Sequence, residues 1–305
     1  MHQPVLLHQT IDYLLNDPHG TYVDCTVGGG GHLGALLPKL ATDARIIALD
    51  KDLKVMETTR QNFPYDNVHF VQADFRDLAS TLKEAGIEQV DGILLDLGVS
   101  SFQLDDPQRG FSFHEDAYLD MRMNQNQELN AWEIVNNWQE SELKTILRDY
   151  GEERFASSIA RAIVRARQQD PIDSTLKLVE IIRQAVPARY CRAKHPGRKT
   201  FQALRIAVNQ ELEALREVLP QGLQCLKKGG RLCVISFHSL EDRIVKRFFQ
   251  DQARTCVCPP GLPVCVCKHQ AQMQVITKRP VIPTDEECEV NPRARSARLR
   301  VACRL

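Results

Sequence analysis

The sequence contains no apolar run long enough to cross a membrane, and its first residues lack the basic and then apolar pattern of a secretory signal. Net charge is absent too, because 39 Lys and Arg balance 39 Asp and Glu, so composition alone does not indicate a nucleic-acid partner. No internal repeat or low-complexity segment interrupts the chain. We therefore expect a cytoplasmic protein with no membrane partner.

Length and cysteine content limit the number of domains and the class of protein only broadly. The 305 residues are enough for one large domain or two, with a sizeable core. Ten cysteines are present, but in a long chain without an export pattern they are more often reduced thiols or metal ligands than disulfides. The local motifs therefore have to decide the function.

The most informative segment, residues 22–32, leads an apolar strand through Asp24 into the four glycines 28–31. Glycine has no side chain, so a bulky ligand can lie directly on such a backbone at the start of a helix. Asp50 ends the next predicted strand, residues 45–50, where a carboxylate can accept hydrogen bonds from both hydroxyls of a ribose. Two ligand-facing strand ends indicate a nucleoside cofactor.

Charge decides which nucleoside fits. Residues 29–34 have the Gly-x-Gly-x-x-Gly spacing of a dinucleotide site. Asp24 would repel a pyrophosphate but attract a cation, and S-adenosylmethionine carries an ammonium and a sulfonium and no phosphate. The third predicted strand ends at Asp74 and Phe75, an acid and an aromatic suited to its adenine. We favour S-adenosylmethionine; an NAD site and a purely structural glycine turn are the alternatives.

The chain divides by its secondary-structure pattern. Helical and strand patterns alternate over residues 1–100, which indicates a parallel sheet covered by helices. Residues 106–209 show helices without a strand, and the α/β pattern resumes with a glycine turn and a buried strand at 229–236. We expect a Rossmann-like α/β domain formed by residues 1–105 and 210–305, with an all-helical domain inserted between them.

The expected helices carry their own start and stop signals. The first lies near residues 10–16, and the helix after the glycines covers residues 32–40. In the insert, helices are expected at 154–168, from the capping Ser174 to Pro187, and from Thr200 to just before Pro220.

Asp96 ends the fourth predicted strand, where ligands of an open parallel sheet lie. Amino-group methyltransferases place an Asp, Asn or Ser here, followed by two prolines and an aromatic residue. This chain has the Asp without the prolines, since Leu97 and Gly98 follow it. We predict that Asp96 is catalytic; an acid that only caps the strand before a serine turn is the alternative.

A loop at residues 109–114 combines Arg109 with Phe111 and Phe113. A cation next to aromatic rings suits phosphate contact and stacking with an unpaired nucleotide. The alternative is that the phenylalanines simply fill the junction of the two domains.

Basic residues are concentrated in the insert, with twelve Lys and Arg against five Asp and Glu over residues 151–209. Arg154, Arg161 and Arg165 share one helix face, because offsets of seven and four residues return to it. Two more clusters follow, Arg189, Arg192, Lys194, His195, Arg198 and Lys199 in a loop, and Arg293, Arg295, Arg298, Arg300 and Arg304 in the acid-free last fifteen residues. Three clusters favour RNA; a solvated helix face is the alternative for the stripe. We predict substrate contacts from Arg109, Phe111, His195, Arg198 and Lys199.

Four cysteines flank a proline-rich turn at residues 259–263, as Cys256-x-Cys258 and Cys265-x-Cys267. Four thiolates at a hairpin can hold a tetrahedral zinc ion, although structural zinc sites favour two or more residues between paired cysteines. A structural zinc, a redox-labile cluster and four ordinary thiols remain open, and we expect no catalytic metal. The histidines His32, His195 and His238 have no acid-base partner in sequence, so we expect them to pack or to form hydrogen bonds.

Taken together, these motifs resemble the family of ribosomal RNA small subunit methyltransferase H, also called the MraW family. The resemblance extends over nearly the whole chain. The segments that carry it are HQPVLL at 2–7, GGH at 30–32, DGILLDLGVSS at 91–101, RGFSF at 109–113, DMRM at 120–123, YGEERFA at 150–156, TFQALRI at 200–206, ISFHSLEDR at 235–243 and NPRARS at 291–296.

This resemblance implies a class I methyltransferase sheet and transfer of a methyl group from S-adenosylmethionine to the exocyclic N4 amine of a cytidine in the decoding region of small-subunit ribosomal RNA. The partner it implies is that RNA in an assembled or nearly assembled subunit, and a homodimer is compatible with it. The cofactor contacts that it implies are Gly30, Gly31, His32, Asp50, Phe75, Asp96 and Gln103. A non-enzymatic RNA-binding or assembly protein that keeps an inert cofactor fold is the remaining alternative.

Overall fold

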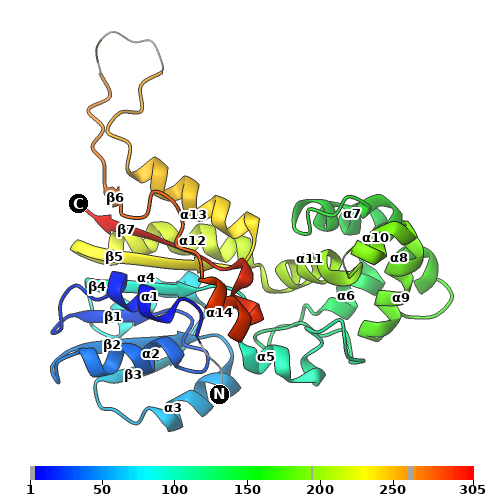
Figure 1. Cartoon of the computed structure of the whole chain (residues 1–305), viewed down its shortest axis with the longest axis horizontal. Coiled ribbons are helices and arrows are strands. Elements are labelled where there is room, and N and C mark those ends of the chain that lie inside the picture. Colours follow the sequence, from blue (N-terminus) through cyan, green and yellow to red (C-terminus); the bar gives the residue numbers. More distant parts are fainter. Residues whose placement is uncertain (1–3, 194, 260–263, 265) are drawn as a thin grey trace. The chain divides into compact units, whose positions relative to one another are not determined.

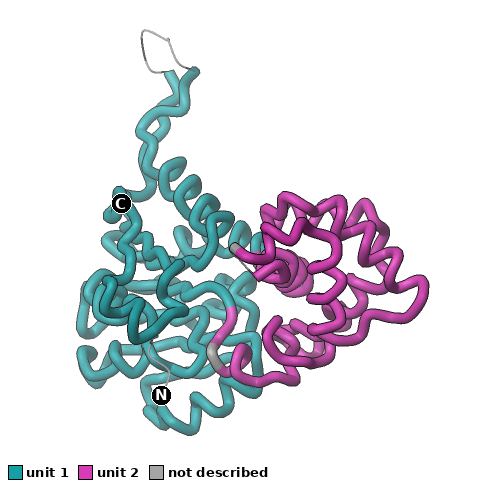
Figure 2. Tube along the Cα trace, turned by 45° about the vertical axis from the view of Figure 1, so that its right-hand side comes forward, with its two compact units in different colours: residues 1–98, 212–305 teal, residues 99–211 magenta. Residues whose placement is uncertain are grey.

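The computed structural model describes residues 4–193, 195–259, 264 and 266–305. Of the residues named above, His2, Gln3, Lys194, residues 260–263 and Cys265 lie outside this part. The chain forms two compact units, residues 1–98 with 212–305 and residues 99–211, coloured teal and magenta in Figure 2. In the described part, no helix is long and apolar enough to cross a membrane.

The first unit is built on a seven-stranded sheet with the order β3-β2-β1-β4-β5-β7-β6 (Figure 1). Strands β1 to β5 pair in parallel, whereas β7 runs antiparallel to both of its neighbours. The strand bounds are β1 Thr21–Asp24, β2 Arg45–Asp50, β3 Val68–Gln72, β4 Val90–Asp96, β5 Leu226–Ser236, β6 Met273–Val275 and β7 Arg298–Arg304. The predicted Rossmann-like α/β sheet is confirmed.

Helices cover both faces of this sheet. Successive side chains of a strand point to opposite faces, so Tyr22 and Val23 of β1 belong to two different apolar clusters. One cluster includes helices α1 (Leu7–Leu14) and α2 (Gly31–Leu36). The opposite cluster includes helices α4 (Leu78–Glu84), α12 (Glu211–Cys225) and α13 (Ser239–Gln252). The strands buried on both sides therefore lie at the centre of a three-layer unit.

Five further elements complete the described part of this unit. They are the 3-10 turns η1 Leu37–Lys39, η2 Phe75–Asp77 and η4 Pro292–Ser296, and the helices α3 Leu53–Asn62 and α14 Asp285–Val290. Asp52 caps α3 by accepting a hydrogen bond from the backbone of Val55.

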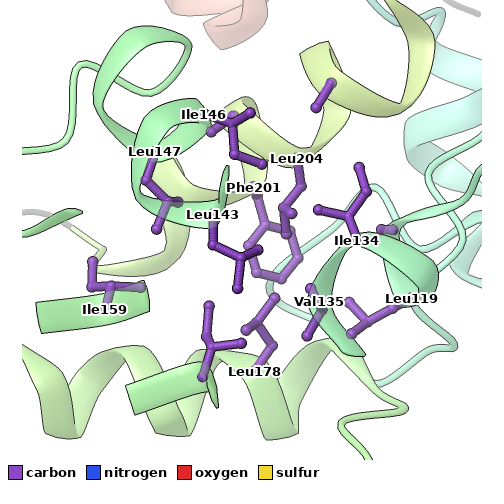
Figure 3. Packing of buried hydrophobic residues seen from close by; sticks show 14 of the residues in the cluster. Leu119, Ile134, Val135, Leu143, Ile146, Leu147, Ile159, Leu178, Phe201 and Leu204 are labelled. Carbon is purple, nitrogen blue, oxygen red and sulfur yellow. The ribbon is translucent and has the colours of Figure 1, made fainter. Parts of the chain in front are cut away.

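The second unit is helical, with no strand among its described residues. Its elements are α5 Ser101–Asp105, η3 Pro107–Arg109, α6 Ala131–Asn137, α7 Glu140–Asp149, α8 Ala156–Arg167, α9 Thr175–Ala185, α10 Ala188–Ala193 and α11 Gly197–Asn209. Leu143, Leu178 and Phe201 meet at the centre of its core (Figure 3). Ser174 caps α9, as predicted, by accepting a hydrogen bond from the backbone of Lys177.

Three sequence expectations about element bounds are wrong. The helix expected at residues 200–220 is two helices, α11 and α12, because Gln210 between them adopts a left-handed conformation with φ of 50°. Pro220 lies inside α12, whose apolar face is buried on the sheet, and does not end the helix. Gly229, with φ of 81°, lies within an irregular first part of β5 that already begins at Leu226.

The first helix also starts three residues earlier than expected, since α1 spans Leu7–Leu14 and not residues 10–16. Leu6, at its N-cap, has a φ of 53° and is fully buried. The apolar side chain at the helix start is therefore held by packing, which a search for polar caps does not detect.

Candidate active site

Three acidic residues end neighbouring parallel strands at one edge of the sheet. Asp24 ends β1, Asp50 ends β2 and Asp96 ends β4. In the strand register Asp24 lies opposite Ala48 and Leu94, each two residues before the acid of its own strand. The carboxyl ends of these strands therefore bring the three acids together, as the sequence predicted for a ligand site.

These carboxyl groups hold protons more tightly than ordinary aspartic acids. Burial raises the pKa of Asp24 to about 7, and the charge of Asp50 adds to the effect. Burial likewise raises the pKa of Asp50 to about 6. The pKa of Asp96 is well above its usual value because of burial and the nearby charges of Asp24 and Glu241. A cationic ligand would relieve this accumulation of negative charge.

Asp50 also orders the loop of glycines. Its Oδ2 accepts a hydrogen bond from the backbone of Gly28 at 2.9 Å, and its Oδ1 accepts one from the backbone of Asp52 at 2.9 Å. The side chain of Thr59 donates to the Gly28 carbonyl from the other side. The acid that we predicted to bind ribose is therefore held firmly in place by the loop beside it.

The glycines at positions 30 and 31 are required by close packing within the protein. A Cβ on Gly30, whose φ is 75°, would lie 2.4 Å from the ring of Phe63. A Cβ on Gly31 would lie 2.1 Å from Pro4. Both distances are far below van der Waals contact, so these two positions need glycine whether or not a ligand is bound. Contact of Gly30 and Gly31 with the cofactor remains a prediction.

His32 follows the glycines in the first turn of α2 and is buried. Its Nε2 donates a hydrogen bond to the Val5 carbonyl at 3.1 Å. Its Nδ1 lies 3.6 Å from Oδ2 of Asp96, too far for a hydrogen bond but close enough for a charge on either group to act on the other. The expected hydrogen bond is present, and the proximity to Asp96 is an addition that no sequence signal indicated.

Asp96 offers an unused acceptor. Its Oδ1 is buried and has no hydrogen-bond partner among the described residues. Its backbone N–H donates to Oγ1 of Thr26 at 2.7 Å, which fixes the end of β4 against the loop after β1. A buried acceptor without a partner is costly, so its presence at the strand ends points to a ligand that donates a hydrogen bond there.

Sequence reasoning missed two residues around Asp96. One is Thr26, and the other is Glu241 in the first turn of α13, whose charge contributes to the raised pKa of Asp96. Oε2 of Glu241 accepts hydrogen bonds from the backbones of Phe237 and His238. His238 in turn caps α13, which fits the structural role expected for it. The only available signal for Glu241 was its place in the 235–243 motif.

Phe75 and Asp74 begin the turn after β3. Phe75 is half-buried against the apolar cluster of the sheet. Asp74 lies 4.0 Å from Nζ of Lys51 and 3.5 Å from Nε of Arg76, so its charge is balanced within the protein. Asp74 differs in this respect from the three strand-end acids, and the adenine contact of Phe75 stays a prediction.

Gln103 belongs to the second unit. It is buried in α5, where Ser100 and Gln103 form a reciprocal capping box. Its Oε1 accepts a hydrogen bond from the Ser100 backbone at 3.0 Å. This bond already accounts for the side-chain oxygen, and the role of Gln103 in cofactor binding remains a prediction.

The loop at residues 109–113 is internal to the second unit. Arg109 is buried and donates to the backbone carbonyls of Arg122 and Met123 at 2.8 and 3.0 Å. Phe111 is part of the apolar core. A buried guanidinium that binds carbonyls is not presented to an RNA phosphate, and Phe111 fills the core of this unit, so substrate contact by the two residues stays a prediction.

His195 stacks on Phe113, with ring centroids 4.4 Å apart and an angle of 20° between the planes. Burial lowers the pKa of His195, and the nearby His114 and Arg183 contribute, so its ring is neutral at pH 7. The Nδ1 atom accepts a hydrogen bond from the backbone of Gly197. His195 therefore contributes an aromatic ring with polar nitrogen atoms, and not a positive charge, to this part of the loop.

The basic loop keeps exposed cations. Among the described residues, no ion pair is found for Arg189, Arg192 or Arg198, and all three are exposed. Lys199 is partly buried and donates to the Glu152 carbonyl, which ties it to the fold. Arg198 is thus better placed than Lys199 to contact an external anion.

Of the predicted basic clusters, the one in the last fifteen residues is largely engaged in contacts within the protein. Arg300 is buried and binds both carboxylate oxygens of Asp242, at 2.6 and 3.1 Å, and Arg298 binds the same carboxylate at 3.1 Å. Arg304 donates to the carbonyls of Gln224 and Leu226. In the helix stripe, Arg154 and Arg165 are exposed, whereas Arg161 lies 3.8 Å from Glu140. Arg298, Arg300 and Arg304 therefore already have partners within the protein, and RNA contact by the last fifteen residues stays a prediction.

Known proteins can now be compared with this site. The model of the MraW methylase family matches residues 1–305. The chain belongs to the MraW methylase family. This membership decides between the two nucleoside alternatives in favour of a methyl donor.

Curated relatives cover the chain almost completely. A protein of Clostridium botulinum named ribosomal RNA small subunit methyltransferase H is 49% identical over 304 residues, which are 99% of this chain and 98% of the relative. A protein of the same name from Heliobacterium modesticaldum is 51% identical over 305 residues, which are 99% of this chain and 97% of the relative. Among solved structures, an rRNA methylase from Streptococcus thermophilus aligns with 100% of this chain and 99% of its own, with a TM-score of 0.44 and 12% identity.

Proposed function

We propose that this chain transfers a methyl group from S-adenosylmethionine to the exocyclic N4 amine of a cytidine in the decoding region of small-subunit ribosomal RNA. The observation that carries the proposal is Asp96, a half-buried acid at the end of β4 with one buried oxygen that has no partner among the described residues. Such an oxygen accepts a hydrogen bond from an N–H group, and the exocyclic amine of cytosine provides that group.

The acids of the site fit a cationic nucleoside. S-adenosylmethionine, when bound, supplies a methyl group on a positively charged sulfur. Asp24, with a pKa raised to about 7, gains a favourable charge partner when a cation arrives. Asp50 at the end of β2 is the acceptor for the ribose hydroxyls, and Phe75 offers a half-buried ring to the adenine. His32, Gly30, Gly31 and Gln103 complete the proposed contacts.

The proposed chemistry needs orientation more than a strong base. The lone pair of the cytosine amine is delocalised into the ring, so the nitrogen has to be turned toward the methyl group that it attacks. A hydrogen bond from the amine to Oδ1 of Asp96 holds it in that direction. Once the nitrogen is alkylated it is acidic enough to release a proton, and Asp96 can receive it because its pKa is raised.

The RNA substrate is proposed from the names of the relatives and from the exposed cations of the second unit. Arg189, Arg192 and Arg198 are exposed, and cations at such positions can contact the backbone that flanks the target nucleotide. The target base has to leave any stack before it reaches Asp96. An assembled or nearly assembled small subunit is the proposed form of the substrate, in the cytoplasm.

The test combines labelled cofactor with nucleoside analysis. Small-subunit RNA and intact small subunits from cells that lack this enzyme are incubated with the chain and labelled S-adenosylmethionine, and the nucleosides are identified by mass spectrometry. N4-methylcytidine at a single decoding-region position is expected. Asp96→Asn should lower kcat by roughly a hundredfold or more. Asp91→Asn is the matched control, because Asp91 lies at the other end of the same strand and binds Lys227.

Two results would contradict the proposal. Methylation of another base or another atom would replace the substrate assignment. Cofactor binding without methylation of either substrate form would favour the non-enzymatic alternative.

A further inference from the structure

The segment between α13 and β6 carries a feature that the methyl-transfer site does not use. In Figure 1 it leaves the end of α13 and returns to β6 as an arm that stands away from the sheet. The backbone of Gln272 donates to the carbonyl of Gln252 at 2.8 Å and closes the base of the arm. Cys256, Cys258 and Cys267 lie on it, and their sulfur atoms are all within 4.8 Å of one another.

We propose that these three thiolates bind one structural zinc ion. The sulfur atoms of Cys256 and Cys267 are 3.8 Å apart. Two thiolates on the same tetrahedral zinc ion, each at about 2.3 Å from the metal, lie about 3.8 Å from each other. A disulfide would need an S–S distance of about 2.05 Å, so the observed separation matches a shared metal and not a bond.

Backbone N–H groups point at the same sulfur atoms. The N–H of Cys258 donates to Sγ of Cys256 at 3.4 Å, and the N–H of Val257 donates to Sγ of Cys267 at 3.4 Å. Hydrogen bonds of this kind stabilise the charged thiolate that a metal requires and orient the ligand. Only Val257 separates Cys256 from Cys258, yet the sulfur atoms of the two cysteines lie close together. The backbone N–H of Val257 is one of the two hydrogen-bond donors to the cluster.

The described residues of the arm form no apolar core of their own that would hold it together. Val257, Val264 and Val266 are 53%, 70% and 72% exposed. A small element that buries so little apolar surface usually depends on a disulfide or a metal for its order. The three cysteines provide three of the four donors that a tetrahedral zinc ion takes, and zinc here stabilises the arm without taking part in methyl transfer.

Metal analysis of the full-length chain tests this proposal. Protein purified without chelators, and protein reloaded with zinc after reduction, should contain one zinc ion per chain. Cobalt(II) in its place should give the intense near-ultraviolet absorption of thiolate-to-cobalt charge transfer. Cys256→Ser and Cys267→Ser should each weaken zinc binding by roughly tenfold or more. Cys288→Ser is the matched control, because Cys288 is a half-buried free cysteine in α14.

Limited proteolysis provides a readout that is independent of activity. Trypsin can cut after Arg254 and Lys268, which flank the cysteines, and zinc should slow these cuts in the parent chain but not in Cys256→Ser. Failure of the reduced chain to bind zinc or cobalt would overturn the proposal, and so would zinc binding that survives in both variants. Recovery of a Cys256–Cys267 disulfide from protein kept under reducing conditions would replace zinc with a redox pair. Methyl transfer is measured separately, so its loss would not be mistaken for loss of the metal.

Discussion

Nδ1 of His32 and Oδ2 of Asp96 lie 3.6 Å apart, although one residue begins α2 and the other ends β4. The Nε2 of His32 carries a proton, because it donates to the Val5 carbonyl. A neutral His32 therefore turns a lone pair toward Asp96, whose pKa burial has raised. At this distance a charge on one of the two groups acts on the other.

The first prediction concerns this pair. His32→Gln keeps an amide donor for the Val5 carbonyl but removes the ring nitrogen that faces Asp96. Without a ring that can take up positive charge beside it, the carboxylate of Asp96 is less stable, so the acid limb of the kcat profile should move to higher pH. The measurement is kcat against pH at saturating cofactor.

His19→Gln is the control for that experiment, because His19 pairs with the exposed Asp43 and precedes β1 at the opposite end of the strand. An acid limb that stays in place in His32→Gln, at an unchanged kcat, would assign His32 to packing alone.

The second prediction is that cofactor binding releases protons. Asp50 and Asp24 have pKa values of about 6 and about 7, so both carry partial proton occupancy between these pH values. A cation bound beside them lowers both pKa values and drives the protons off. Calorimetry of S-adenosylmethionine binding in buffers of different ionisation enthalpy measures the number released.

S-adenosylhomocysteine, which lacks the sulfonium charge, is the matched ligand and should release fewer protons. Equal release by the two ligands would show that the acids do not respond to the sulfonium.

The third prediction concerns the stability of the ligand-free chain. The pKa of Asp24 rises from 3.8 to about 7 on folding, so the folded state binds more protons between these values. Stability contributed by the protonated acid is complete below pH 3.8 and is lost as the pH rises through about 7. Asp24→Asn should remove this loss and raise the Tm at neutral pH, by an amount that corresponds to a few kcal/mol at most.

Thermal melts of the ligand-free protein across this pH window provide the measurement. Asp74→Asn is the control, since the Asp74 carboxylate is balanced by Lys51 and Arg76. A lower Tm for Asp24→Asn than for the parent chain at neutral pH would contradict the raised pKa.

Local sequence patterns predicted the sheet well. β2 runs over Arg45–Asp50, as expected, because a short continuous apolar run, typical of a strand buried on both faces, ends in an acid there. Pro220 is an exception to these local sequence rules. It lies inside α12, where burial of residues such as Leu215 and Leu219 against the sheet outweighs the hydrogen bond that proline removes.

The site could be predicted only in part. Strand ends placed Asp24, Asp50 and Asp96 at one edge, because that placement follows from parallel pairing alone. The proximity of His32 to Asp96 depends on how α2 packs, which no sequence spacing records. The partners of the arginines could not be predicted for the same reason: Arg300 binds Asp242 from 58 positions away in sequence, and composition cannot distinguish such a pair from an RNA contact.

The last prediction separates exposed cations from those already paired. Arg198 lies in the first turn of α11, is exposed and has no ion pair among the described residues, so it can release a counterion from RNA phosphate. Arg198→Ala should weaken binding to small-subunit RNA and reduce the slope of log affinity against log salt by about one, with cofactor affinity unchanged. Arg183→Ala is the matched control, because Arg183 is an exposed arginine of the same unit that already binds Glu180 at 2.8 Å. Filter binding at several salt concentrations measures both quantities, and equal slopes for Arg198→Ala and the parent chain would show that the basic loop is a solvated surface.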